Sequence, residues 1–209
     1  FVYFAVTGGA ALAIGAWLVY VRGPLALALM GAGAFFVIFY TWPLKYIGLG
    51  ELAVLLVWGP LMTGGTYFVV TGGWSWEAAV VSLPSALGAT TVLFGKHIDK
   101  LEADKAKGIY TMPVLLGERN ARYTALGMMA LQYAIAVGLV FYGFSAALLA
   151  VFIEAKDWPL LGRTYRAPKP TERPGFVPDD VWPLYFSAGA FVHCRNFGLF
   201  YLAALAIDV

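Results

Sequence analysis

Hydrophobic residues in this chain form long, almost continuous runs that are separated by short polar segments. The runs cover 1–21, 25–41, 52–70, 78–94 and 123–142. A bilayer core about 30 Å thick is crossed by about 20 helical residues, so each run predicts a membrane-spanning helix. The predicted fold class is therefore an all-α, polytopic bundle of transmembrane helices.

The last third of the chain is less regular. The apolar run 143–154 is too short to span alone, because about 20 residues are needed. The segment 156–180 holds five prolines and several basic residues, which predicts an extended loop outside the membrane. Two final apolar pieces, 181–192 and 197–207, are separated by His193-Cys194-Arg195-Asn196, which indicates either a cavity or a break in the helix.

Composition supports a membrane protein with a single transmembrane domain over 1–209. The 209 residues are 61% hydrophobic and only 12% charged, far from the balance of a soluble domain. The net charge of +2 is small and the basic residues do not form one stripe, so no nucleic-acid partner is expected. Cys194 is the single cysteine, which excludes an internal disulfide. The opening residues lack an initiator methionine, and we expect the chain to be incomplete at its N-terminus.

Three polar loops carry nearly all of the lysine and arginine residues: 42–51, 96–122 and 156–180. The order of the predicted spans puts all three on the same side of the membrane. The positive-inside rule assigns that side to the cytoplasm. We expect an integral protein of a bacterial inner membrane, surrounded by lipid, with its chemically interesting loops cytoplasmic.

The second of these loops crowds opposite charges together. Three acids lie within six residues: Asp99, Glu102 and Asp104. Neighbouring side chains are basic: Lys96, His97, Lys100, Lys105 and Lys107. Carboxylates can share a Mg²⁺ ion that keeps positions open for substrate phosphates, and lysines can neutralise the remaining phosphate charge. The same charges would also suit a solvated loop next to the membrane, so composition alone leaves both readings open.

Three stretches resemble a known family in their order along the chain: FYTWPLKYIGLGE, WGPLMTGGTYFVVTG and DKLEADKAKGIYTMPVLLGERNAR. Together, over about residues 1–140, they are similar to the UbiA superfamily of intramembrane prenyltransferases. The most specific element is GxxTxPVxLG, formed by Gly108, Thr111, Pro113, Val114, Leu116 and Gly117. The branch of the menaquinone pathway, which prenylates dihydroxynaphthoate, is the most similar in appearance.

The resemblance implies a Mg²⁺-dependent transfer of a prenyl group from its diphosphate to an aromatic acceptor, in the synthesis of quinones or related lipids and pigments. By this resemblance Lys45 binds the diphosphate and Tyr40 lies near the reacting carbon. Lys96 and Lys107 are further candidates for binding the diphosphate. The metal ligands are expected among Asp104, Glu102 and Asp99, the first two by their match to family acids and Asp99 by its chemistry alone.

Two departures keep a second function open. The first aspartate-rich motif of the family, NDxxDxxxD, does not occur in this chain, and Lys100 stands where the second motif normally has an acid. The alternative is a non-catalytic subunit of the same fold that packs against membrane-protein partners or binds a quinone or pigment. Glu51 enters a predicted span, and is expected to belong either to the site or to the start of a helix. His97 is a candidate ligand in an altered metal site.

Overall fold

The computed structural model describes residues 2–175 and 177–207, and these ranges contain helices joined by turns, without a strand. The predicted all-α class is confirmed. The first half comprises α1 (Val2–Arg22), α2 (Pro24–Phe39), η1 (Leu44–Ile47), α3 (Gly50–Leu56), η2 (Val57–Gly64), α4 (Gly65–Thr71), α5 (Trp76–Val81) and α6 (Leu83–Asp99). The second half comprises α7 (Leu101–Ala106), α8 (Met112–Leu116), α9 (Glu118–Tyr142), η3 (Ala146–Asp157), α10 (Trp158–Arg166) and α11 (Tyr185–Leu205).

Four helical stretches are long and apolar enough to cross a membrane: Ala5–Arg22, Gly50–Thr71, Trp76–Asp99 and Glu118–Tyr142. The shorter helix α2 is also apolar. These stretches correspond to the five long hydrophobic runs of the sequence. The protein is therefore an integral membrane protein.

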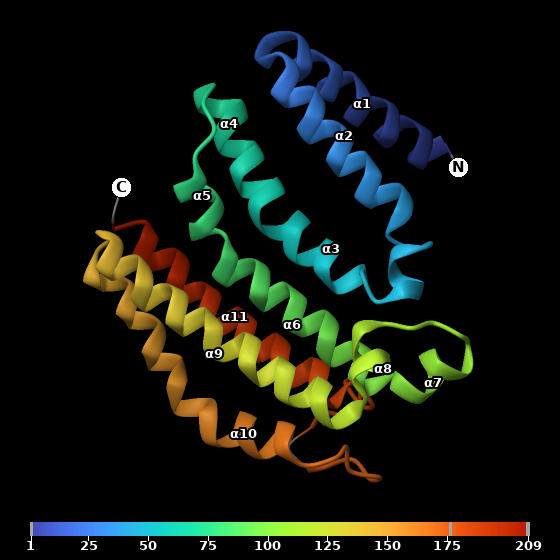
Figure 1. Cartoon of the computed structure of the whole chain (residues 1–209). Coiled ribbons are helices and arrows are strands. Elements are labelled where there is room, and N and C mark those ends of the chain that lie inside the picture. The colour runs from blue at the N-terminus through green and yellow to red at the C-terminus, as the bar shows by residue number, and fades with distance from the viewer. Residues whose placement is uncertain (1, 176, 208–209) are drawn as a thin grey trace.

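Helices α1 and α2 form a hairpin at the edge of the molecule (Figure 1). Gly23 takes a positive φ of 78° in the turn, and Pro24 begins α2, where its missing N–H costs nothing. The Arg22 side chain crosses to the C-terminal end of α4 and donates to the carbonyl oxygens of Val69 and Val70 at 2.6 and 2.7 Å. The hairpin is thus tied to the third span at one end.

The third span is continuous but kinked. Its middle turn, η2, is a π-helical segment in which Gly59 has φ −111° and ψ −107°, followed by Pro60, which lacks an N–H for the helix. A Cβ atom on Gly59 would lie 2.8 Å from the Cβ of Ala86. The absence of a side chain at this position therefore lets the kinked span approach α6 closely.

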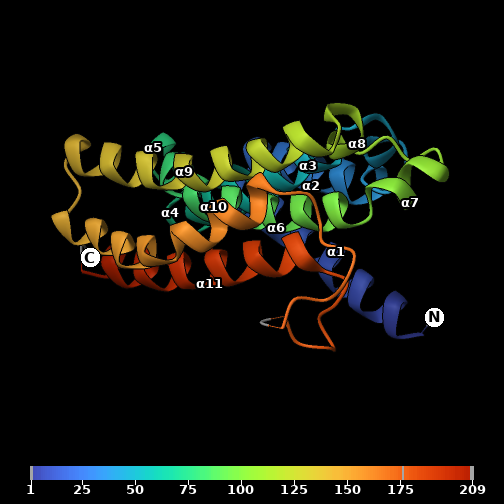
Figure 2. The same ribbon diagram turned by 90° about the horizontal axis from the view of Figure 1, so that it is seen from below.

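The core lies where α6 packs against both α9 and α11 (Figure 2). Buried residues from these helices form one cluster with α10: Phe94, Ile98, Ala121, Ala125, Met129, Leu161, Tyr165, Phe186 and Ala190. Gly95 marks the closest crossing, since a Cβ atom there would lie 2.8 Å from the backbone of Phe186 and Ser187. Helix α6 is therefore fixed directly against the start of α11.

One expectation for the last third is wrong. The predicted extended loop begins with a helix, α10, because Leu161, Thr164 and Tyr165 recur on one buried face while Arg163 and Arg166 stay exposed. The apolar run 143–154 lies mostly in the 3-10 helix η3, which continues into α10, and it was correctly expected to be too short to span alone. Of the two alternatives at His193, the break does not occur, since α11 runs through this position, whereas His193 does line a cavity and its imidazole has a partner on α9.

The polar segments η1, α7, α8, 167–175 and 177–184 lie together at one end of the bundle, which we call the loop end (Figure 1). This end also receives the last residues of α2 and α6 and the first residues of α3 and α9. Residues that are far apart in the sequence therefore meet there.

Candidate active site

A buried acid and a buried histidine meet at the loop end. Glu51 lies in the first turn of α3 and His97 in the last turn of α6, and the Glu51 Oε1 atom is 2.6 Å from the His97 Nδ1 atom. Each side chain is 3% exposed. The second carboxylate oxygen of Glu51 accepts the backbone N–H of Met112, at the start of α8, at 3.3 Å. The pair thereby joins three elements of the loop end.

Both residues were candidates from the sequence for separate reasons. Their pairing joins positions 46 residues apart, so no local spacing indicated it. The sequence left two roles open for Glu51, in the site or at a helix start. The structure adds a third role, because the Glu51 carboxylate holds α3, α6 and α8 together.

Tyr40 and Lys45 lie next to this pair. The backbone N–H of Lys45 donates to the Tyr40 carbonyl oxygen at 3.0 Å and turns the chain back over α3. A Cβ atom on Gly50 would lie 3.3 Å from the Cα of Lys45 and 3.6 Å from the ring of Tyr40. Burial, and secondly the negative charge of Glu51, raise the pKa of the Tyr40 phenol, so it stays neutral at physiological pH.

An apolar pocket of about 390 Å³ runs between α2 and the third span, and we call it the α2–α3 pocket. Its walls are Gly33, Phe36, Val37, Tyr40, Ala53, Val54, Val57 and Trp58. Tyr40 follows the last residue of α2, so its ring marks the loop end of the pocket. Trp58 lies on η2, further into the membrane-spanning region. A long apolar chain would fit such a space with its polar end beside Tyr40.

Asp104 provides oxygen atoms that lack partners. Its side chain is buried, and its Oδ2 atom has no hydrogen-bond partner. The Thr111 hydroxyl at the start of α8 is also buried and without a partner. Buried polar atoms normally have partners, and carboxylate and hydroxyl oxygens are the ligands that a hard cation prefers. Each of these two oxygen atoms is of the kind that suits Mg²⁺, whereas Glu102, two residues before Asp104, is exposed.

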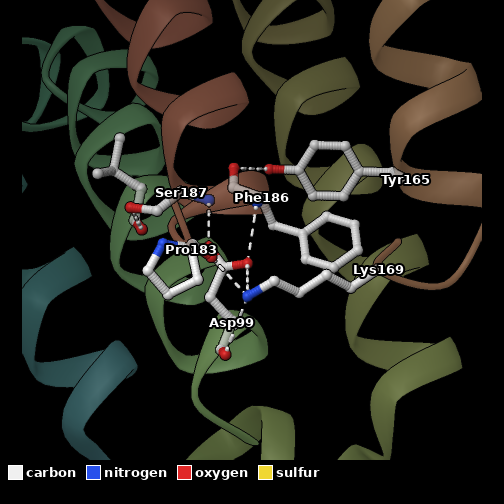
Figure 3. A network of polar contacts seen from close by, with 7 residues as sticks. Asp99, Tyr165, Lys169, Pro183, Phe186 and Ser187 are labelled. Atoms are coloured by element: carbon white, nitrogen blue, oxygen red, sulfur yellow. Dashed lines mark hydrogen bonds and ion pairs between the residues drawn. The ribbon is translucent and has the colours of Figure 1, made fainter. Parts of the chain in front are cut away.

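The Asp99 side chain points toward the start of α11 (Figure 3). Its carboxylate accepts the backbone N–H groups of Phe186 and Ser187, at 3.2 and 2.9 Å, at the start of α11. Its Oδ1 atom also lies 3.3 Å from the Lys169 Nζ atom, and Lys169 in turn donates to the Pro183 carbonyl oxygen. The Asp99 side chain is 1% exposed, so it caps α11 and anchors the segment before it.

The three acids predicted as metal ligands do not gather into one site. Asp99 and Glu102 line a pocket of about 390 Å³ that Asp104 does not line. Within residues 2–175 and 177–207, no group of three or more His, Cys, Asp or Glu side chains is placed to hold a metal ion. The assignment of Asp99, Glu102 and Asp104 as Mg²⁺ ligands remains a prediction.

The three lysines predicted to bind diphosphate differ in their setting. Lys45 is half-buried beside Tyr40, whereas Lys96, in the last turn of α6, and Lys107, directly after α7, are exposed. Lys45, in η1, is thus a cation that lies beside Tyr40 at the polar end of the α2–α3 pocket.

Known proteins similar to this chain are prenyltransferases and proteins of the same family. A 2-carboxy-1,4-naphthoquinone phytyltransferase of Synechocystis is 30% identical over 118 residues, which cover 54% of this chain and 38% of the relative. The UbiA prenyltransferase domain-containing protein 1 of Homo sapiens is 32% identical over 73 residues, 35% of this chain and 22% of that protein. The protein of the same name in Dictyostelium discoideum is 32% identical over 90 residues, 43% of this chain and 27% of that protein.

These matches span well under half the length of each relative. No solved structure matches the chain. Residues 1–170 match the UbiA prenyltransferase family, which is most of the 209 residues and confirms the resemblance found in the sequence. The chain therefore belongs to the UbiA prenyltransferase family.

Proposed function

We propose that this protein transfers a prenyl group from a prenyl diphosphate to an aromatic acceptor, in the synthesis of a quinone or a related membrane lipid. The observation that carries the proposal is the α2–α3 pocket, an apolar space that ends at Tyr40 beside Lys45 and the buried Glu51–His97 pair. Family membership and the phytyltransferase relative support the same class of reaction.

The prenyl chain would lie in the α2–α3 pocket with its diphosphate at the loop end. Lys45 would bind the diphosphate there, and the exposed Lys96 and Lys107 would add positive charge from the aqueous side. The lysines favour departure of the diphosphate, because its negative charge grows as the carbon–oxygen bond breaks. The aromatic acceptor then attacks the allylic carbon and loses a proton.

Tyr40 has a distinct part in this scheme. Its neutral ring lies at the end of the pocket where the allylic cation would form. An aromatic face stabilises a nearby cation by about 0.5–2 kcal/mol, depending on how far water is excluded. Tyr40 would therefore lower the barrier without exchanging a proton.

Asp104, with Glu102 and the hydroxyl of Thr111 close in sequence, is the part of the chain that would hold Mg²⁺. When bound, the ion supplies charge neutralisation to the departing diphosphate. The Glu51–His97 pair would act as positioning residues, because it fixes the start of α3 against α6 and α8.

One observation favours the alternative, a non-catalytic subunit that packs in a larger membrane complex or binds a quinone or pigment. Asp99 is occupied in capping α11, and Lys100 replaces the acid expected next to it. The second metal motif of this chain is therefore weaker in acids than the family pattern.

Diphosphate release and prenyl transfer distinguish the two functions. The protein in lipid nanodiscs would be given geranylgeranyl diphosphate and 1,4-dihydroxy-2-naphthoate, with Mg²⁺ or with a chelator. We expect transfer that requires Mg²⁺ and is lost in Asp104→Asn. Glu77→Gln is the matched control, since it also removes one carboxylate but lies in α5 at the opposite end of the bundle (Figure 1). A folded protein that releases no diphosphate would favour the non-catalytic subunit.

A further inference from the structure

A second pocket lies on the other side of the bundle, between η3, α10 and α11. It has a volume of about 280 Å³ and shares no wall residue with the α2–α3 pocket. We call it the η3–α11 pocket. Leu160, which is 53% exposed, and Pro178 lie at its mouth, whereas Glu154 and His193 lie at its buried floor.

The floor contains polar atoms that have no partners. The His193 Nε2 atom is 3.2 Å from the Gln132 Oε1 atom, and because that oxygen can only accept, Nε2 is the nitrogen that donates. The His193 Nδ1 atom then faces the Glu154 Oε1 atom at 4.0 Å, too far for a hydrogen bond. Neither of these two atoms has a hydrogen-bond partner, although each residue is only 1% exposed.

One oxygen atom of a ligand can satisfy both atoms. Hydrogen bonds to a hydroxyl are about 2.8 Å long, and the 4.0 Å gap is shorter than two such bonds, so a hydroxyl placed between Nδ1 and Oε1 reaches both. A hydroxyl donates one hydrogen bond and accepts others. When one proton is held between His193 Nδ1 and Glu154, the hydroxyl accepts from the protonated group and donates to the other, so both atoms are satisfied.

The rest of the pocket requires an apolar body. A water molecule occupies about 30 Å³ in the liquid, roughly a tenth of this space, so one bridging water would leave most of the pocket unfilled. The walls above the floor are mostly apolar or aromatic: Leu160, Leu161, Val177, Tyr185 and Val192. Pockets for drug-sized ligands begin at about 300 Å³, so this one suits a molecule of one or two rings.

We propose that the η3–α11 pocket binds a neutral hydroxyaromatic molecule of one or two rings, through a hydroxyl shared between His193 and Glu154. A phenol suits the site better than an aliphatic alcohol, because its hydroxyl is the stronger donor and its flat ring can pack against Tyr185. The inference does not rest on prenyl transfer, since it concerns a different pocket and a different set of residues.

Photolabelling tests the proposal without any prenyl substrate. The probe is a phenol with a trifluoromethyl-diazirine group, and its methyl ether, which cannot donate, is the matched control. The protein in nanodiscs would be irradiated with each probe and its labelled peptides identified by mass spectrometry. We expect the phenol to label peptides that contain 154–164 and 185–193, and 2-naphthol to compete, with the methyl ether about tenfold weaker because one buried hydrogen bond is lost.

Two substitutions address the pocket separately from folding. Leu160→Trp fills the mouth from an exposed position and should abolish this labelling, whereas Leu199→Trp, at an exposed position of α11 outside the pocket, should not. His193→Phe removes the acceptor at the floor and should weaken labelling about tenfold. Equal labelling by the ether, or labelling of these peptides that survives Leu160→Trp, would overturn the proposal, as would labelling confined to other parts of the chain.

Discussion

Replacing Asp99 by asparagine separates a structural role for this acid from a metal-binding role. Asp99 accepts two backbone N–H groups of α11 and pairs with Lys169. Asparagine keeps one oxygen but turns an NH₂ group toward donors, so at least one hydrogen bond is lost and the Lys169 charge loses its partner. We therefore expect Asp99→Asn to destabilise the protein whether or not Mg²⁺ is present.

The size of the loss follows from these contacts. A hydrogen bond to a charged group contributes about 1.5–3 kcal/mol, and breaking a fully buried ion pair costs about 3–5 kcal/mol. The Lys169 side chain is 24% exposed, which reduces its share, so about 3 kcal/mol is expected in total. For a chain of this size about 2–4 °C is lost per kcal/mol, which predicts a Tm about 6–12 °C lower.

Thermal unfolding in nanodiscs, with Mg²⁺ and with a chelator, measures this prediction. Lys169→Met should give a smaller loss, about 1 kcal/mol, since it leaves the two N–H contacts of Asp99 intact. Asp104→Asn should change the Tm little, because its Oδ2 atom has no partner to lose. An Asp99→Asn protein with the same Tm as the parent would refute the reasoning. A lower Tm seen only when Mg²⁺ is present would instead support Asp99 as a metal ligand.

Two further predictions concern the candidate active site. Glu51→Gln should lower stability by about 1–3 kcal/mol, because an amide cannot accept from both His97 and Met112; unfolding temperature measures this, and a fall in kcat with little change in KM would support a positioning role. The raised pKa of Tyr40 keeps its phenol neutral to a higher pH than usual, so prenyl transfer should show no loss from Tyr40 ionisation below about pH 10. Tyr40→Phe should then keep the parent pH profile, whereas Tyr40→Leu should slow transfer about tenfold by removing the ring, and equal rates for the two variants would contradict a role for the ring.

The long hydrophobic runs predicted the membrane-spanning helices because a helix that is apolar on all sides is stable in few environments other than a lipid bilayer. Helix α10 was missed because its prolines and arginines dominate the composition, although Leu161 and Tyr165 already lie at helical spacing. Polar residues in the spans were harder to place. His193 suggested a cavity or a break, and only the packing of α9 against α11 shows that Gln132 is its partner.

Residues of the candidate site could be proposed from the sequence, but the contacts between them could not. Motif resemblance identified Tyr40, Lys45 and Asp104, because their spacing is local. The Glu51–His97 pair and the contacts of Asp99 with α11 join positions 46 to 88 residues apart. Such pairings depend on which helices cross, and a single sequence does not state that.

The attachment of the α1–α2 hairpin determines how the α2–α3 pocket can admit a substrate. One wall of this pocket is α2, which packs mainly against α1, η2 and α4 and takes no part in the core of α6, α9 and α11. Arg22 holds the hairpin to α4 at the end of the molecule opposite Tyr40. At the other end the turn through Tyr40 and Lys45 joins the hairpin to α3, so the hairpin is held at both ends and we expect the wall between these two attachments to move most. A bulky prenyl chain could then enter sideways from the lipid while the core helices stay in place.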